Sequence, residues 1–229
     1  MGLFTKIQRM GRAKQIILKP VTSKRGNYFI RLNHYSGKVV PNSQLHLGVF
    51  LDNKLHGVMQ FGPSIDKRNL IGLVNGTKWN EFIELNRMAF DDYLPKNSES
   101  RAISIAMRLI KKHKPCIKWV ISFADATQCG TGTIYRASGF KLISIVENTA
   151  IKINPITKEK IHVIQAYHKN LFEYKNWEKL KGYQIKYIYF IDKSYEEKLT
   201  VPILPFSKLD ELNYPKGVKH KEYLKADVM

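Results

Sequence analysis

The chain has 229 residues, enough for one large α/β domain, and its 44% hydrophobic and 25% charged residues exclude an intrinsically disordered protein. Its 38 Lys and Arg outnumber its 19 Asp and Glu, which gives a formal net charge of +19 at pH 7. Because Lys and Arg release counterions when they contact phosphates, this charge predicts a polyanionic partner, and we expect nucleic acid.

Residues 1–25 are the most one-sided part of the sequence, with seven Lys or Arg and no acidic residue. We expect a basic arm that follows the phosphates of double-stranded DNA. Its candidate DNA-binding residues are Arg9, Arg12, Lys14, Lys24 and Arg25. No long apolar run follows the first basic residues, and no run reaches transmembrane length, so we expect a cytoplasmic protein without a membrane partner.

Two apolar runs, 46–51 and 56–61, flank a short polar turn at 52–55 and predict a β-hairpin. Residues 79–86 predict the next strand. Apolar side chains at three- and four-residue spacing then predict a helix between Asn97 and Lys114, because Pro115 ends it.

Alternating apolar residues next predict a strand that ends at Ala124-Asp125, followed by a short helix over 130–138. Further strands are predicted at 140–146, 161–167 and 183–191. This order predicts an α/β fold with a mixed sheet and helices on its faces. We divide the chain into the basic arm (1–25), a single domain (26–200) and an irregular C-terminal tail (201–229).

Several familiar sites are absent from the sequence. It contains no Walker loop and no G-x-G-x-x-G after a first strand, which disfavours a nucleotide-driven motor and a Rossmann oxidoreductase. Its two cysteines, Cys116 and Cys129, do not form a paired metal motif, which excludes a multi-cysteine zinc site.

The segment Thr133-Ile134-Tyr135-Arg136-Ala137-Ser138-Gly139-Phe140 resembles the helix-to-strand signature of the GNAT acyltransferases. That resemblance implies that Tyr135 protonates the departing thiolate of coenzyme A, a task that suits a phenol. It also implies that the helix near Asn97 binds the pyrophosphate, with Ser100 and Arg101 as the candidate cofactor-binding residues. The glycines of the usual phosphate loop are missing there, so the acyl donor stays open, with acetyl-coenzyme A or a related compound as one candidate.

A wider set of segments resembles the Mom proteins of bacteriophages, in order and spacing, over about residues 26–195. The segments are Asn33-His34-Tyr35-Ser36-Gly37, Glu84-Leu85-Asn86-Arg87-Met88, Glu99-Ser100-Arg101, Ile121-Ser122-Phe123-Ala124-Asp125, Tyr135-Arg136-Ala137-Ser138-Gly139-Phe140 and Tyr187-Ile188-Tyr189-Phe190-Ile191-Asp192. The resemblance implies a three-layer GNAT-like catalytic domain with additional C-terminal strands.

The same resemblance implies a DNA-modifying enzyme of the host bacterial cytoplasm. Its reaction would convert adenine in DNA to an N-carbamoylmethyl (methylcarbamoyl) derivative on the exocyclic amine and so protect phage DNA from host restriction. A small-molecule donor is implied as well. The implied functional positions are His34, Tyr35, Arg87, Ser122, Asp125 and Tyr135. Iron is implied as a metal that His34 and Tyr35 could bind.

Each of these residues also has a structural interpretation. Asp125 could accept a proton from the adenine amine or orient the base, or it could cap a turn or helix. Arg87 could clamp a carboxylate or phosphate of the donor with two hydrogen bonds, or form a buried ion pair with Asp91 or Asp92.

The remaining candidates carry the same ambiguity. His34 and Tyr35 could stack on an extruded base, transfer a proton or bind a metal, although such a pair also occurs as ordinary structure. Ser122 could contact donor or adenine, or only form a hydrogen bond beside the sheet. Tyr135 could be a core aromatic between helix and sheet.

Two other functions stay open. A conventional GNAT N-acetyltransferase for an amine of a protein or small molecule predicts affinity for acetyl-coenzyme A and transfer to peptides. A non-catalytic basic DNA-binding protein predicts binding without any change in the mass of the nucleosides.

Overall fold

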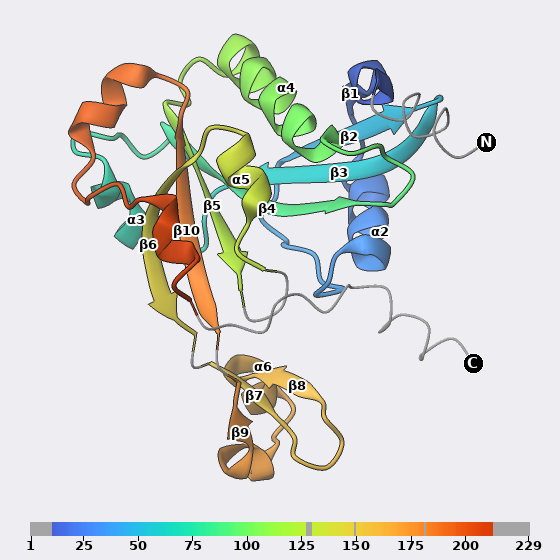
Figure 1. The fold of residues 1–229 in the computed structure, drawn as a ribbon, viewed down its shortest axis with the longest axis vertical. Helices are drawn as coiled ribbons and strands as arrows, with labels where there is room; N and C mark the ends of the chain where they lie inside the picture. The colour runs from blue at the N-terminus through green and yellow to red at the C-terminus, as the bar shows by residue number, and fades with distance from the viewer. Residues whose placement is uncertain (1–10, 127–129, 149, 181, 213–229) are drawn as a thin grey trace.

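One seven-stranded sheet organises the computed structural model, which describes residues 11–126, 130–148, 150–180 and 182–212 (Figure 1). Its strands are β1 (Ile17–Pro20), β2 (Leu45–Leu51), β3 (Lys54–Gly62), β4 (Phe82–Phe90), β5 (Trp119–Asp125), β6 (Lys141–Glu147) and β10 (Tyr183–Phe190). They follow the order β1-β2-β3-β4-β5-β10-β6. Neighbours are antiparallel except β4 and β5, which are parallel, so the predicted mixed sheet is confirmed.

The sheet is split between its two parallel strands. β4 pairs with β5 only where Phe82–Glu84 meet Trp119–Ile121. Two residues later β4 contains a bulge, because Leu85 pairs with Phe61 and Arg87 with Gln60, which leaves Asn86 without a counterpart on β3. A bulge bends its strand. The two strands consequently diverge, and their carboxyl ends lie on opposite sides of a gap in the ladder (Figure 1).

Helices cover both faces of the sheet and complete three layers. α4 (Ser98–His113) buries a stripe of apolar residues, among them Ile103 and Ala106, against one face. On the other face, Phe29 and Ile30 of α2 (Ser23–Asn33) pack on Val58 of β3. The shorter helical elements are η1 (Ala13–Gln15), α3 (Lys67–Leu70), η2 (Ile71–Leu73), α5 (Thr133–Ala137), η4 (Lys193–Lys198) and η5 (Phe206–Leu209).

A small unit of residues 150–180, which we call the subdomain, is inserted between β6 and β10. It has a second sheet in the order β8-β7-β9, made of β7 (Ile151–Ile153), β8 (Lys160–His162) and β9 (Glu178–Lys179). α6 (Val163–His168) and η3 (Phe172–Asn176) pack on it around a core of their own, made of Ile161, Ala166, Tyr174 and Trp177. Figure 1 places the subdomain beyond the ends of β6 and β10.

Local patterns predicted six of the seven strands of the main sheet, together with α4 and α5, but not β1, α2 or most of the subdomain. The strand predicted over 161–167 is wrong beyond His162, where α6 begins. The arm expected over 1–25 joins the fold from residue 13 on, because Ala13 and Ile16 are buried, β1 pairs with β2 and α2 begins at Ser23. Within the expected tail, Leu204 pairs with Leu142 and packs on the core.

None of the helices that the structure describes has the length and apolarity needed to cross a bilayer.

The contribution of α4 to stability can be tested at Ile103, whose side chain is fully buried. We expect Ile103→Ala to lower the free energy of unfolding by about 2 to 5 kcal/mol, because it removes methyl groups and leaves a cavity. The neighbouring exposed Ser104→Ala is the control and should change it by less than about 0.5 kcal/mol. Urea unfolding followed by circular dichroism measures both, and equal effects would contradict the packing described.

Candidate active site

Two adjoining cavities fill the split between β4 and β5. Their volumes are about 540 and 1030 Å³. Side chains from the α2–β2 loop, the bulged part of β4 and the end of β5 line both of them: Tyr35, Leu85, Asn86, Arg87, Phe123 and Ala124. The shared walls make one continuous cleft, open at the smaller end to α5 and at the larger end to the subdomain.

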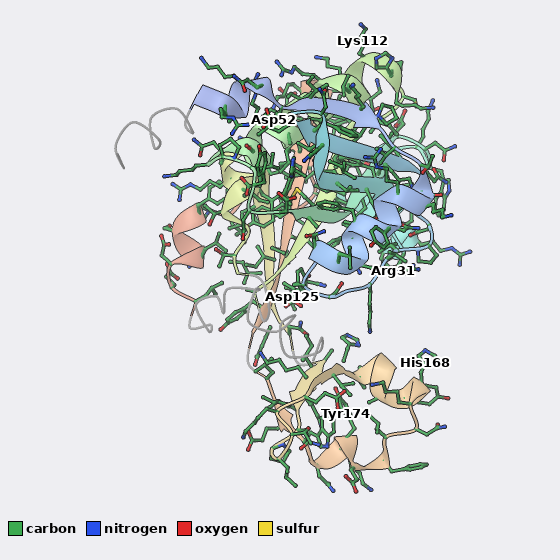
Figure 2. All side chains as sticks on the ribbon, turned by 90° about the vertical axis from the view of Figure 1, so that its right-hand side faces the viewer. Arg31, Asp52, Lys112, Asp125, His168 and Tyr174 are labelled. Carbon is green, nitrogen blue, oxygen red and sulfur yellow. The ribbon has the colours of Figure 1, made fainter. Side chains whose placement is uncertain are left out.

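The structure brings together all six residues expected to carry the chemistry. Tyr35 and Arg87 line both cavities, His34 and Tyr135 line the smaller one, and Asp125 lines the larger one. The sixth, Ser122, is fully buried behind Tyr135 and contacts its hydroxyl. Figure 2 shows Asp125 at the level where the main sheet faces the subdomain. The six come from four separate stretches of sequence, so the fold alone assembles them.

Tyr135 is held in place by a buried hydrogen bond. The Oγ of Ser122 lies 2.8 Å from the phenol oxygen and 3.3 Å from the carbonyl oxygen of Leu85. The 2.8 Å separation is normal for a hydrogen bond between two hydroxyl groups, and the Leu85 carbonyl can only accept. This buried contact holds the phenol oxygen of Tyr135 at the wall of the smaller cavity.

Gly132 makes room for the ring of Tyr135. It has a left-handed φ of 76°, and a Cβ there would lie 2.7 Å from Cδ2 of Tyr135 and 3.1 Å from Cε2 of Tyr187. Tyr187 in turn stacks on Tyr135, with ring centroids 4.9 Å apart, and donates its hydroxyl proton to the Thr131 carbonyl. Only glycine meets both demands.

His34 ends α2 and has a defined tautomer. Its Nδ1 accepts the backbone N–H of Ser36 at 3.2 Å and lies 2.8 Å from the Ser36 hydroxyl. Because a backbone N–H can only donate, the proton of the neutral imidazole resides on Nε2. The ring is 8% exposed and lies against the ring of Tyr35, 4.2 Å between centroids. His34 thus offers the cleft a donor when neutral.

Arg87 follows the bulge and lines both cavities. Its Nε donates to the Lys38 carbonyl at 3.3 Å and its Nη1 to the Asn86 carbonyl at 2.8 Å. These bonds fix the guanidinium while its other N–H groups remain for an anionic ligand. Of its two proposed ion-pair partners, Asp91 instead contacts His56, at 2.8 Å.

Sequence reasoning missed Glu84, a carboxylate in the wall of the larger cavity. Burial raises the pKa of Glu84, and this effect outweighs the hydrogen bonds from Ser64 and Asn86 that lower it. The available signal was an acidic residue between the apolar residues Phe82-Ile83 and Leu85. A carboxylate that holds its proton more tightly than usual is also a better proton acceptor near neutral pH.

The residues expected to bind the donor phosphate lie outside the lining of both cavities. The Ser100 hydroxyl donates to the Asn97 carbonyl at 3.3 Å. Arg101 donates through Nη2 to the Lys14 carbonyl, 3.4 Å away. Their assignment to a cofactor stays a prediction, and Arg101 meanwhile ties the N-terminal segment to α4.

The expected DNA-binding residues divide into groups. Arg12 is paired with Asp52 and lies 3.4 Å from the hydroxyl of Tyr93, so it anchors the hairpin. Lys24 and Arg25 are exposed on α2, and Lys14 is exposed beside η1. Arg9 lies outside the described residues. Only the α2 pair is placed on the helix that leads to the cleft.

The structure shows whether possible metal ligands lie close together. In the part of the chain that the structure describes, no three His, Cys, Asp or Glu side chains are grouped so that they could hold a metal ion. Cys129 lies outside that part. The iron implied by the resemblance stays a prediction.

A seven-stranded sheet of this order, split between its parallel strands and covered by helices on both faces, defines a GNAT-like fold. The Mom protein family matches residues 15–208 of the chain. The chain belongs to the Mom family.

Individual relatives were found by sequence and by structure. The methylcarbamoylase mom of Escherichia phage Mu is 38% identical over 143 residues, which cover 62% of this chain and 59% of that protein. Solved structures that resemble the chain include a Bacillus subtilis acetyltransferase in complex with coenzyme A (TM-score 0.46, 11% identity, 76% of this chain and 97% of that one). A spermidine/spermine N-acetyltransferase of Vibrio cholerae with manganese ions has a TM-score of 0.48, with 9% identity over 81% of this chain and 98% of that one.

The crowding at Gly132 yields a matched pair of variants. Gly130 also has a positive φ, of 88°, but a Cβ there would meet nothing within 4 Å. Gly130→Ala should therefore lower the free energy of unfolding by only about 1 to 2 kcal/mol, the cost of a left-handed backbone in a residue with a Cβ. Gly132→Ala should lower it by about 1 to 3 kcal/mol more, because the Tyr135 and Tyr187 rings must shift. Thermal unfolding compares the two, and equal losses would refute the close packing.

The raised pKa of Glu84 predicts a pH-dependent stability. Because the folded protein holds this proton more tightly than the unfolded chain, the stability contribution of Glu84 falls as pH rises from its unfolded pKa through its folded one. The stability of Glu84→Gln relative to the wild type should thus increase as the pH rises from about 4 to about 8. Urea titrations at both pH values measure this, with the exposed Glu178→Gln as a control that should show no such trend.

Proposed function

We propose that this protein modifies adenine in DNA, transferring a carbamoylmethyl group from a small-molecule donor to the exocyclic amine and so protecting phage DNA from restriction. Membership of the Mom family and the likeness to a phage Mu protein named methylcarbamoylase support the proposal. The observation that carries it is the convergence of His34, Tyr35, Arg87, Asp125 and Tyr135 on one cleft, backed by Ser122.

The reaction needs a proton acceptor near the amine. The exocyclic nitrogen of adenine is a weak nucleophile because its lone pair is delocalised into the ring. As the new N–C bond forms, one amine proton must leave. Four carboxylates line the larger cavity, namely Glu84, Asp125, Glu147 and Glu159, and we assign the role of acceptor to Asp125 or Glu84, which belong to the two strands of the split. Glu84 suits the task through its raised pKa, and Asp125 through its place at the open end of β5.

The leaving group needs a proton donor. When the bond between the donor carbon and its leaving group breaks, the electron pair stays with the leaving group, which then takes up a proton. Tyr135 can supply it, because a phenol can donate its proton to a developing anion and Ser122 holds the phenol oxygen at the cavity wall. A hydrogen bond donated by Ser122 can then stabilise the phenolate that results.

The other cleft residues bind and orient. Arg87, fixed by two backbone carbonyls, can hold an anionic or carbonyl group of the donor. The rings of His34 and Tyr35 are tilted by 32° to each other and both line the smaller cavity, where an extruded purine can lie against them. If coenzyme A carries the donor group, the N-terminal end of α4 is where its phosphates would bind.

The chemistry is tested by nucleoside mass spectrometry of DNA from bacteria that express the protein. We expect Tyr135→Phe and Asp125→Asn each to lower the yield of modified adenine by about 100-fold or more, as loss of an acid or base does. Tyr189→Phe and Asp210→Asn, the same substitutions outside the cleft, should leave the yield unchanged.

Three results would count against the proposal. Full modification by both cleft variants removes the assigned roles. Unmodified adenine with the wild type, combined with tight binding of acetyl-coenzyme A and transfer to peptides, identifies a conventional N-acetyltransferase. DNA binding without any change in nucleoside mass identifies a passive DNA-binding protein.

A further inference from the structure

The larger cavity has two walls of different origin. One wall belongs to the main domain and includes Tyr35, Lys38 and Arg87. The opposite wall belongs to the subdomain and includes Lys160, His162, His168 and Lys169, whose ammonium lies 3.5 Å from the carboxylate of Glu159 in the same wall. A ligand in the larger cavity therefore touches both units. The subdomain wall contains none of the residues proposed to transfer protons or to hold the donor.

The subdomain presents aromatic rings to solvent beside this wall. Tyr167 is 80% exposed and Phe172 is 85% exposed. Exposure alone does not identify a binding residue, so the position of each ring relative to the cavity decides which one is a candidate. Tyr167 directly precedes the cavity-lining residues His168 and Lys169, and its ring lies 5.9 Å from that of His168. The residues flanking Phe172 do not line the cavity.

The main domain offers a matching surface on α2. One exposed stripe of this helix carries Lys24, Tyr28, Arg31 and Leu32, with Arg25 beside it. The chain has no acidic residue before Asp52, so nothing on α2 offsets these charges from within its own segment. Figure 2 shows Arg31 on α2 and His168 on α6 toward the same side of the molecule, above and below the level of Asp125.

We propose that α2 and the subdomain are two jaws that hold duplex DNA across the mouth of the cleft, with Tyr167 stacking on the bases next to an adenine extruded into the larger cavity. The proposal rests on the function proposed above and assigns the partner to a surface. Charge and aromaticity together favour DNA, because cations contact phosphates while an exposed ring can stack on any base. Stacking by Tyr167 would offset part of the unpairing energy.

Binding and extrusion can be measured without any donor, so the jaws are tested separately from the chemistry. The probe is a fluorescent duplex oligonucleotide with one 2-aminopurine in place of adenine, prepared in several sequence contexts. Anisotropy reports binding, and 2-aminopurine fluorescence rises when the base leaves the stack. The full-length protein is used throughout.

The phosphate contacts are tested by charge removal. A plot of log affinity against log salt concentration has a negative slope. Arg31→Gln and Lys169→Gln should each make this slope less steep by about 0.9, the value for one lost phosphate contact. Lys112→Gln, at the end of α4 that Figure 2 places farthest from the subdomain, is the matched control and should leave the slope unchanged. Equal slopes for all three variants and the wild type overturn the jaws.

The stacking role is tested with two exposed aromatics. Tyr167→Ala should lower the extrusion signal at saturating protein by about 5-fold or more, the effect of losing one stacked ring, while Phe172→Ala retains it. Both rings are exposed, so neither variant should unfold, and thermal unfolding checks this. Equal signals from both variants overturn the assignment of Tyr167.

Failure of the two proposals gives different results. If the wild type binds DNA and extrudes the base but the nucleosides stay unmodified, the proposed reaction is contradicted and the proposed DNA-binding surface is not. If Tyr167→Ala, Arg31→Gln and Lys169→Gln all modify DNA fully, the proposed DNA-binding surface is contradicted and the proposed reaction is not. Self-association in sedimentation that both aromatic substitutions abolish, at unchanged DNA affinity, identifies the surface as a contact between two copies of the chain.

Discussion

The site depends on a ladder of backbone hydrogen bonds that stops early. β4 and β5 pair over three residues, and the bulge at Asn86 then bends β4 away. In a regular sheet the polar backbone beyond that point would be paired and covered by its neighbour. Here the divergence opens a cleft in the middle of a packed domain, and the side chains from 85 to 87 and 123 to 125 line it. Core packing on both faces holds the two halves of the sheet apart.

Precision inside the cleft comes from packing rather than from loops. Tyr135 belongs to a five-residue helix that has little stability by itself, yet its ring is enclosed by Gly132, Tyr187 and Phe140. The hydroxyl is fixed by Ser122, a fully buried residue of a central strand. The hydroxyl of Tyr135 is thus held by the buried centre of the sheet, although it is carried by a helix of only five residues.

Local patterns predicted the β2–β3 hairpin, α4 and the strand-helix-strand of residues 119–147, because each has clear periodicity and clear end signals. They missed β1 and α2, whose many cations hide a weak apolar pattern in which only Phe29 and Ile30 face the core. The candidate site residues came from family resemblance, since spacing alone does not show that positions 35, 87, 125 and 135 meet. Glu84 and the three-residue limit of the β4–β5 ladder depend on long-range register, which single-sequence reasoning does not reach.

The position of His34 at the end of α2 has a consequence for energetics. The backbone N–H of His34 closes the last turn of the helix onto the Ile30 carbonyl, which ties the backbone of His34 to α2. Under the proposed function, a ligand on the exposed face of this helix is thereby coupled to the ring at its end. Binding energy from contacts remote from the reacting atoms would then raise turnover as well as affinity.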